Sequence, residues 1–240
     1  MSATIRKFSG TEFEGSACEL AALILEYTHE SVSALLKAFD LARATRASAR
    51  SRSTRGMTTD EEQDLLRAML VMAAAGLDSM SKQLIGDALP LVVHVNERAR
   101  DGLEKYLGKQ LTNDVELISA GRSPKFVAML LSAPDLPKRA AAQYVAQLTS
   151  SSLQSAEELL RTAAAFGLTA GELSTNFQDL KPIFDVRNKI IHELDINLGG
   201  ERRKRNLRSK GDLVRYSNSL LAAGEDLVRA VHRQLIDLSV

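Results

Sequence analysis

Three residues in the last quarter of the chain, Arg187, Asn188 and His192, carry side chains suited to proton transfer next to a phosphate. Histidine titrates near neutral pH, and arginine presents a planar fork of donors that matches phosphate oxygens. On a helix that advances about 100° per residue, Asn188 and His192 lie one turn apart on a polar flank, whereas Arg187 falls within an apolar arc. Burying a guanidinium on an apolar face costs free energy unless the group is paired or lines a solvent-filled cleft.

The apolar arc around Arg187 admits more than one interpretation. Its other members are Ile183, Phe184, Val186, Ile190, Ile191 and Leu194. Arg187 could form a buried ion pair, for which Asp78, in an apolar stretch earlier in the chain, is the candidate partner. His192 could be a surface or capping histidine, and Asn188 a helix-flank amide. Asp195 and His192 would offer a metal only two ligands without a third, so no metal site is predicted.

A basic run follows the helix that carries these residues. Within residues 201–210 it contains Arg202, Arg203, Lys204, Arg205, Arg208 and Lys210, with a single acid, for a net charge of +5. Such a run is commonly a solvated loop, but its place shortly after the Arg–His helix favours contact with phosphates and hence RNA binding. Residues 43–56 carry five arginines and no acid. This stretch is predicted to be a solvated linker or a fraying extension of the preceding helix, and a linker is favoured over a second RNA contact.

The positioning elements are expected to be helices, and the predicted fold class is all-α. Helical spacing of apolar residues dominates every long segment, and the hydroxyl and acidic residues of 58–62 and 155–158 are typical helix starts. Residues 91–95 form the one run that resembles a strand. The predicted helices cover about residues 12–44, as one helix or a pair, 58–85, 89–107, 114–118, 124–131, 136–148, 155–166, 177–194 and 212–238.

Composition sets limits on the class of protein. The 240-residue chain has 45% hydrophobic and 25% charged residues and a net charge of +1, as expected of a globular protein without a strong overall charge. Its single cysteine, Cys18, excludes an intrachain disulfide and a cysteine-based metal cage. The sequence contains no phosphate-binding glycine loop, dinucleotide fingerprint or nucleophile elbow. Without a signal peptide or an apolar stretch of membrane-spanning length, a cytoplasmic protein with no membrane association is expected.

The run Arg187-Asn188-Lys-Ile-Ile-His192 resembles the R-N-x-x-x-H motif of the HEPN superfamily. The resemblance extends to residues 69–78, which look like the buried early helix of larger HEPN domains, and to residues 152–160. The latter resemble a segment before the motif helix in the subgroup associated with RNase LS-like domains. HEPN therefore maps onto residues 58–240 as a multi-helix bundle, and residues 1–57 are expected to form an N-terminal helix and an Arg/Ser-rich linker.

The HEPN resemblance implies a metal-independent endoribonuclease that requires no cofactor. The RNA 2′-OH would attack the adjacent phosphate, with His192 moving the proton, Arg187 stabilising the charged transition state and Asn188 orienting the ribose or His192. It also implies a homodimer in which two motif helices face one cleft, acting in a toxin–antitoxin, antiphage or RNA-processing setting with a possible partner protein. The alternatives are a catalytically inactive HEPN-like module for dimerisation or partner binding, and an unrelated helical adaptor.

Overall fold

The computed structural model is all-helical, which confirms the predicted fold class. It describes residues 4–49, 58–120, 122–131, 135–197, 199 and 204–237. Within these ranges there is no β-sheet; Ile196 and Arg205 form an isolated antiparallel bridge. No described helix is both long and apolar enough to cross a membrane. The elements are η1 (Thr11–Phe13), α1 (Glu19–Ala49), α2 (Asp60–Val95), α3 (Glu97–Ser119), α4 (Lys125–Leu131), α5 (Leu136–Thr149), α6 (Ala156–Ala165), η2 (Ala170–Glu172), α7 (Phe177–Glu193) and α8 (Lys210–Ile236).

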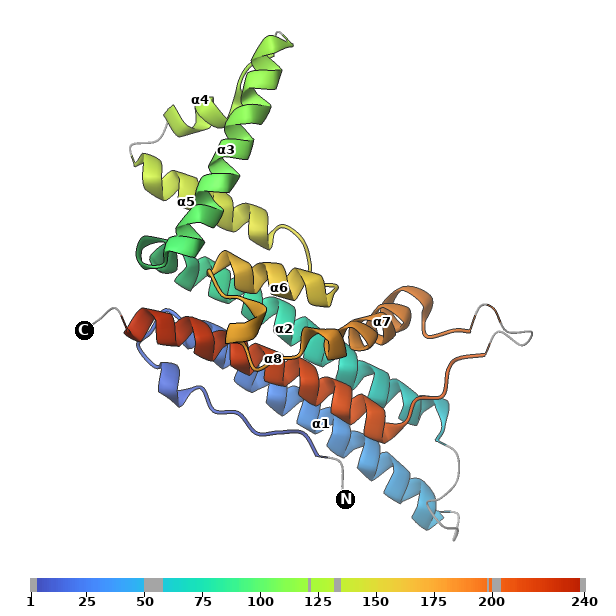
Figure 1. The fold of residues 1–240 in the computed structure, drawn as a ribbon. Helices are drawn as coiled ribbons and strands as arrows, with labels where there is room; N and C mark the ends of the chain where they lie inside the picture. Colours follow the sequence, from blue (N-terminus) through green and yellow to red (C-terminus); the bar gives the residue numbers. More distant parts are fainter. Residues whose placement is uncertain are drawn as a thin grey trace.

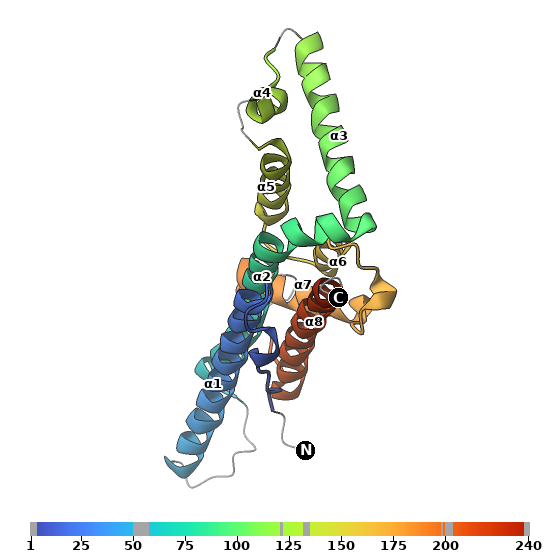
Figure 2. The ribbon, with the colours of Figure 1, turned by 90° about the vertical axis from the view of Figure 1, so that its left-hand side faces the viewer.

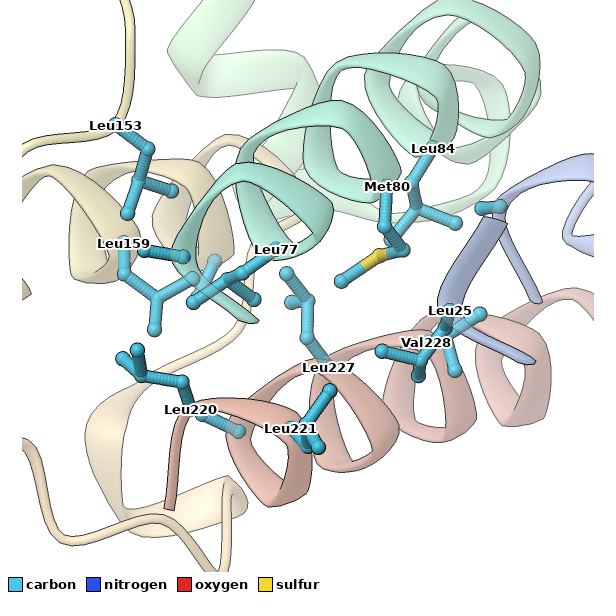
Figure 3. Close-up of a cluster of buried hydrophobic side chains, with 14 of the residues drawn as sticks. Leu25, Leu77, Met80, Leu84, Leu153, Leu159, Leu220, Leu221, Leu227 and Val228 are labelled. Carbon is cyan, nitrogen blue, oxygen red and sulfur yellow. The ribbon is translucent and has the colours of Figure 1, made fainter. Parts of the chain in front are cut away.

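Three long helices, α1, α2 and α8, run side by side and form the body of the molecule (Figures 1 and 2). Their shared core contains Leu25 of α1, Leu77 and Met80 of α2, and Leu227 and Val228 of α8, all at most 1% exposed (Figure 3). α6 and α7 pack against this body, and α3, α4 and α5 project from the end of α2 (Figure 2). The central helix α2 contacts each of the other helices that carry candidate functional residues.

The start of α2 forms as its sequence predicts, but its end does not. Thr59 and Glu62 make a capping box, with the Thr59 hydroxyl accepting from the Glu62 amide at 3.3 Å. The helix then continues through Pro90 to Val95 instead of ending near residue 85. The run 91–95, which resembles a strand in sequence, is therefore helical, because burial of residues on both sides of Pro90 outweighs the one backbone bond that proline removes.

The helices predicted at 89–107 and 114–118 are also revised by the structure. Asn96 interrupts the first of them, and its side chain accepts a hydrogen bond from the Ala99 amide and so starts α3. α3 then runs without a break to Ser119 and includes residues 114–118. The other predicted helices agree with α4 to α8 to within two residues at each end, and Gly167 has the left-handed backbone (φ +73°) expected of a helix C-cap.

The N-terminal helix, predicted for residues 1–57 together with a linker, packs into the main core. Leu25, Val32 and Phe39 of α1 are fully buried in the same cluster as the α2 and α8 side chains. Near its end, Arg46 donates two hydrogen bonds to Glu62 of α2, at 2.8 and 3.0 Å. α1 reaches Ala49, so part of the expected linker is helix, while residues 50–57 lie outside the described ranges.

A tight contact between α1 and α2 at Gly76 generates a prediction about stability. A Cβ added at Gly76 would lie 2.1 Å from the Thr28 hydroxyl and 2.2 Å from its methyl group. Gly76→Ala is therefore expected to lower the free energy of unfolding by about 1–3 kcal/mol through overpacking, measured by chemical denaturation. Gly86→Ala in the same helix, with nothing within 4 Å of the added atom, should instead raise it by about 0.5–1 kcal/mol. Equal effects of the two variants would contradict this account of the crossing.

Candidate functional site

Helix α7 carries Arg187, Asn188 and His192 and is anchored by its apolar side. The Asn176 side chain caps its start by accepting a hydrogen bond from the Gln178 amide, and Ile183 and Phe184 are each 2% exposed. The helix spans Phe177–Glu193, as predicted. It contacts α6, α2 and α8, which fixes its rotation about its own axis.

The Arg187 side chain is partly buried and incompletely paired. Its Nη1 donates to Asn188 Oδ1 at 2.9 Å, but its buried Nε has no hydrogen-bond partner within the described residues. Burial lowers the pKa of Arg187, and the nearby carboxylates of Asp78 and Glu158 act in the opposite direction. Arg187 thus retains an unused donor, which in a folded protein calls for a reason.

Asp78 lies close enough to influence Arg187 but is bound to other groups. Its Oδ2 accepts from Lys82 Nζ at 2.9 Å, and its Oδ1 accepts from the Leu153 amide at 2.7 Å. No ion pair between Asp78 and Arg187 occurs in the described part of the chain. Asp78, the candidate partner, therefore acts on Arg187 only at longer range, and it holds the segment between α5 and α6 in place.

Asn188 contacts Arg187 and not His192. Besides accepting from the guanidinium, its side chain donates through Nδ2 to the Gln154 carbonyl at 3.2 Å, in the segment that Asp78 also holds. The amide therefore fixes the direction of Arg187 relative to the segment between α5 and α6.

His192 is exposed, as its place on the polar flank predicts, and among the described residues no hydrogen bond or ion pair engages it. Its neighbours Ile191 and Leu194 are 39% and 61% exposed, although the apolar arc predicts their burial. Five residues on a helix correspond to about 140° of rotation and about 7.5 Å of rise. Arg187 and His192 of one chain consequently face different directions.

Most of the described basic residues after α7 are committed to carboxylates. Arg205 Nη1 pairs with Asp64 at 2.9 Å, and Lys210 pairs with Asp40 at 2.6 Å. Arg208 makes two hydrogen bonds to Asp195, at 2.9 and 2.5 Å. The predicted phosphate-binding role of these three residues therefore competes with intramolecular pairing. Lys204 is exposed, while Arg202 and Arg203 lie outside the described residues.

Asp195, which sequence reasoning considered only as a metal ligand, is the centre of a buried charge cluster. It is 0% exposed and accepts from Arg67 Nε at 3.2 Å and from Asn206 Nδ2 at 3.0 Å, in addition to Arg208. Burial opposes ionisation, but the bonds from Arg208, Asn206 and Arg67 prevail and lower the pKa of Asp195. The only signal in the sequence was an acid directly after the motif helix followed by a basic run, and it does not identify Arg67.

The described residues contain no group of three or more histidine, cysteine or acidic side chains placed to hold a metal ion. Comparison of the chain with protein-family models, with curated proteins and with solved structures finds no match. The chemistry of the site therefore rests on the residues themselves.

Replacement of Asp195 tests the charge cluster. Asp195→Asn should lower the free energy of unfolding by about 3–5 kcal/mol, because Arg67, 4% exposed, would keep only the half-exposed carboxylate of Asp64 as an anionic partner. Asp64→Asn, which removes a carboxylate that is 51% exposed, should cost no more than about 1 kcal/mol. Chemical denaturation of both variants measures the difference.

The stability difference between wild type and Asp195→Asn should depend on pH in a defined direction. Because the pKa of Asp195 is lowered on folding, its stabilisation is present above the unfolded pKa, about 3.9, and is lost as pH falls through the folded value. The stability gap between wild type and Asp195→Asn should hence narrow below about pH 4. A gap that widens in acid would exclude this assignment.

Proposed function

We propose that the protein is a metal-independent endoribonuclease whose reaction is carried by Arg187 and His192. The observation that supports this most is the Arg187 guanidinium, a partly buried cation with an unpaired Nε and no direct carboxylate partner among the described residues. Five residues further along the same helix, His192 is exposed and free to exchange protons with a substrate. A phosphate diester supplies the anion that the guanidinium lacks.

The chemistry proceeds within the RNA and consumes no co-reactant. The 2′-OH loses its proton, its oxygen bonds to phosphorus, and the bond from phosphorus to the 5′ oxygen breaks as that oxygen gains a proton. Histidine serves as the proton-transfer group, and arginine stabilises the negative charge that grows on the phosphate oxygens. The products carry a 2′,3′-cyclic phosphate and a 5′-OH. Asn188 holds the guanidinium in position.

The protein acts as a homodimer in this proposal. Arg187 and His192 of one helix diverge by about 140°, so they meet one phosphate most readily when each comes from a different chain. The exposed Ile191 and Leu194, next to His192, provide apolar area that a second motif helix would cover. Such a dimer brings two copies of His192 to one cleft, one to accept a proton and one to donate it.

The biological setting that fits this activity is toxin–antitoxin, antiphage defence or RNA processing in the cytoplasm. An enzyme that cleaves RNA without a metal needs restraint by a partner protein or by limited substrate choice. A second candidate function, a dimerisation or partner-binding module without activity, would follow if Arg187 serves only to order the segment that Asn188 contacts.

Single substitutions test the chemistry. Arg187→Ala and His192→Ala should each reduce RNA cleavage by about 10²–10⁴-fold, because each removes a group that acts in the transition state. Activity should persist in EDTA, and the products should carry cyclic phosphate ends. His192→Ala should leave the melting temperature unchanged because the side chain is exposed. Lys189→Ala, an exposed residue on the same helix, is the matched control and should remain active.

A mixing experiment tests the composite site. Combining the inactive Arg187→Ala and His192→Ala proteins after unfolding and refolding should restore partial cleavage, because each mixed dimer holds one Arg187 and one His192 on different chains; cleavage stays below the wild-type rate because the second histidine is absent. Full cleavage by His192→Ala, or loss of activity in EDTA, would falsify the mechanism. An inactive but dimeric wild-type protein would favour the second function.

We expect RNA affinity that depends on salt concentration to come from Arg202, Arg203 and Lys204. These residues precede the basic residues that pair with carboxylates. Replacing Arg202, Arg203 and Lys204 with alanine in His192→Ala protein should reduce the slope of log affinity against log salt by about 0.7 for each phosphate that the protein no longer binds. Fluorescence anisotropy with a single-stranded RNA over a potassium chloride series measures this slope. Arg205→Ala, whose cation pairs with Asp64, should change the slope less. An unchanged slope in the triple variant would identify the run as an ordinary solvated loop.

A further inference from the structure

A pocket of about 190 Å³ lies between α2, α6 and the segment that joins α5 to α6, and two of its lining acids, Asp78 and Glu158, act electrostatically on Arg187. Its charged lining comes from Asp78 and Lys82 of α2 and from Glu158 and Arg161 of α6. Leu153 lines it and extends into the core next to Leu159 (Figure 3). The RNA chemistry proposed above does not use this pocket.

Ser81 gives the pocket an unsatisfied polar group. The residue is 2% exposed, lines the pocket, and its hydroxyl has no hydrogen-bond partner within the described residues. A serine or threonine inside a helix commonly bonds to the carbonyl four residues earlier. Thr28, Thr149 and Thr162 do so here, at 2.7, 2.9 and 3.1 Å. The Ser81 hydroxyl is therefore available to a group that enters the pocket, and its burial without one is unfavourable.

The charges of the lining favour a neutral ligand with both donors and acceptors. Two acids and two bases give no net charge, so an isolated phosphate gains little there. Lys82 is already paired with Asp78, whereas Arg161 makes no hydrogen bond or ion pair in the described part of the chain. The lining therefore offers to a polar ring edge the Ser81 hydroxyl, the Arg161 guanidinium and the Glu158 carboxylate, of which Oε2 already accepts from the Gln154 amide.

The volume favours one ring system. At about 190 Å³ the pocket is smaller than the roughly 300–1,000 Å³ of sites for drug-sized ligands, and larger than the roughly 150 Å³ cavity that holds a benzene. A single nucleobase satisfies both the size and the pattern of donors and acceptors.

Hydrogen bonds connect the pocket lining to Arg187 through the segment between α5 and α6. Asp78 accepts from the Leu153 amide, and Asn188, which holds the guanidinium, donates to the carbonyl of the next residue, Gln154. Glu158 lies in the pocket lining and also acts electrostatically on Arg187. A base in the pocket would thus sit one short segment away from the phosphate-binding cation.

We infer that this pocket is a nucleobase subsite that selects the base next to the cleaved phosphate, with Ser81 as its specificity-determining residue. The inference rests on the proposed nuclease function for its biological meaning, but nucleobase binding can be measured without cleavage. Recognition comes from hydrogen bonds to the base edge, and loss of one such bond weakens affinity by roughly 2- to 10-fold.

The test uses full-length His192→Ala protein and titrates adenosine, guanosine, cytidine, uridine and inorganic phosphate by ligand-observed NMR. One nucleoside should bind more tightly than the others, and phosphate should not compete with it. Ser81→Ala should weaken the affinity for that nucleoside by roughly 2- to 10-fold, and Ser81→Leu should abolish its binding by filling the pocket. Ser217→Ala is the matched control, because Ser217 is also buried and unpartnered within the described residues but does not line the pocket.

The outcomes separate the subsite from the nuclease. Absence of nucleoside binding, equal binding by Ser81→Leu protein of unchanged melting temperature, or competition by phosphate overturns the subsite. If wild type still cleaves RNA in a His192-dependent manner in that case, the nuclease proposal stands alone. Selective nucleoside binding that depends on Ser81, in a protein that cleaves no RNA, supports the subsite and removes its assignment to cleavage.

Discussion

The buried carboxylate of Asp195 is the interaction on which the arrangement around the motif helix depends. It lies directly after α7 and binds Arg67 of α2 and Arg208 just before α8, so three segments distant in sequence meet at one anion. Leu194 and Asp195 both adopt left-handed backbone angles, φ 51° and 57°, which non-glycine residues rarely accept. The hydrogen bonds to Asp195 compensate for that backbone cost, and they fix where the helix ends and where the chain turns back.

A second set of bonds orients the other side of α7. Asp78 and Arg67 belong to the same helix, about 16 Å apart along its axis, and each holds a segment that contacts α7. Asp78 holds Leu153, next to the residue that Asn188 contacts, whereas Arg67 reaches Asp195. α2 therefore acts as a rigid frame with α7 attached at two points, and the direction of the guanidinium follows from this frame. The geometry of this site therefore depends on α2 and α7 together with the segment between α5 and α6 that Asp78 holds.

Local signals in the sequence were sufficient to predict most helices. The Thr59 and Ser155 caps, the Gly167 C-cap and the periodicity of residues 177–194 act within a few residues, and each agrees with the structure. Long-range pairing was not predictable. The bond between Arg67 and Asp195 spans 128 positions, and nothing local marks either residue as a partner. For the same reason the sequence did not indicate the ion pairs of Arg205, Arg208 and Lys210, or that the apolar face of α1 packs into the common core. The position of Arg187 within an apolar arc was visible in sequence, but the identity of its neighbours was not.

The two charged centres, Asp195 and Arg187, differ in their hydrogen bonding. Asp195 supports the fold, whereas Arg187 is available to a ligand. Every oxygen of the Asp195 carboxylate is bonded to a donor from the same chain, so adding a ligand there would require breaking existing bonds. Arg187 Nε and Ser81 Oγ are buried without partners among the described residues; the segment between α5 and α6 lines the pocket that contains Ser81 and also contacts Asn188, the partner of Arg187. Burial of an unsatisfied donor costs about 1–3 kcal/mol, and a ligand that supplies acceptors recovers that energy on binding. Under the proposed function, an RNA strand would offer a phosphate oxygen to the first group and a base edge to the second, so that one ligand would account for both unpaired groups.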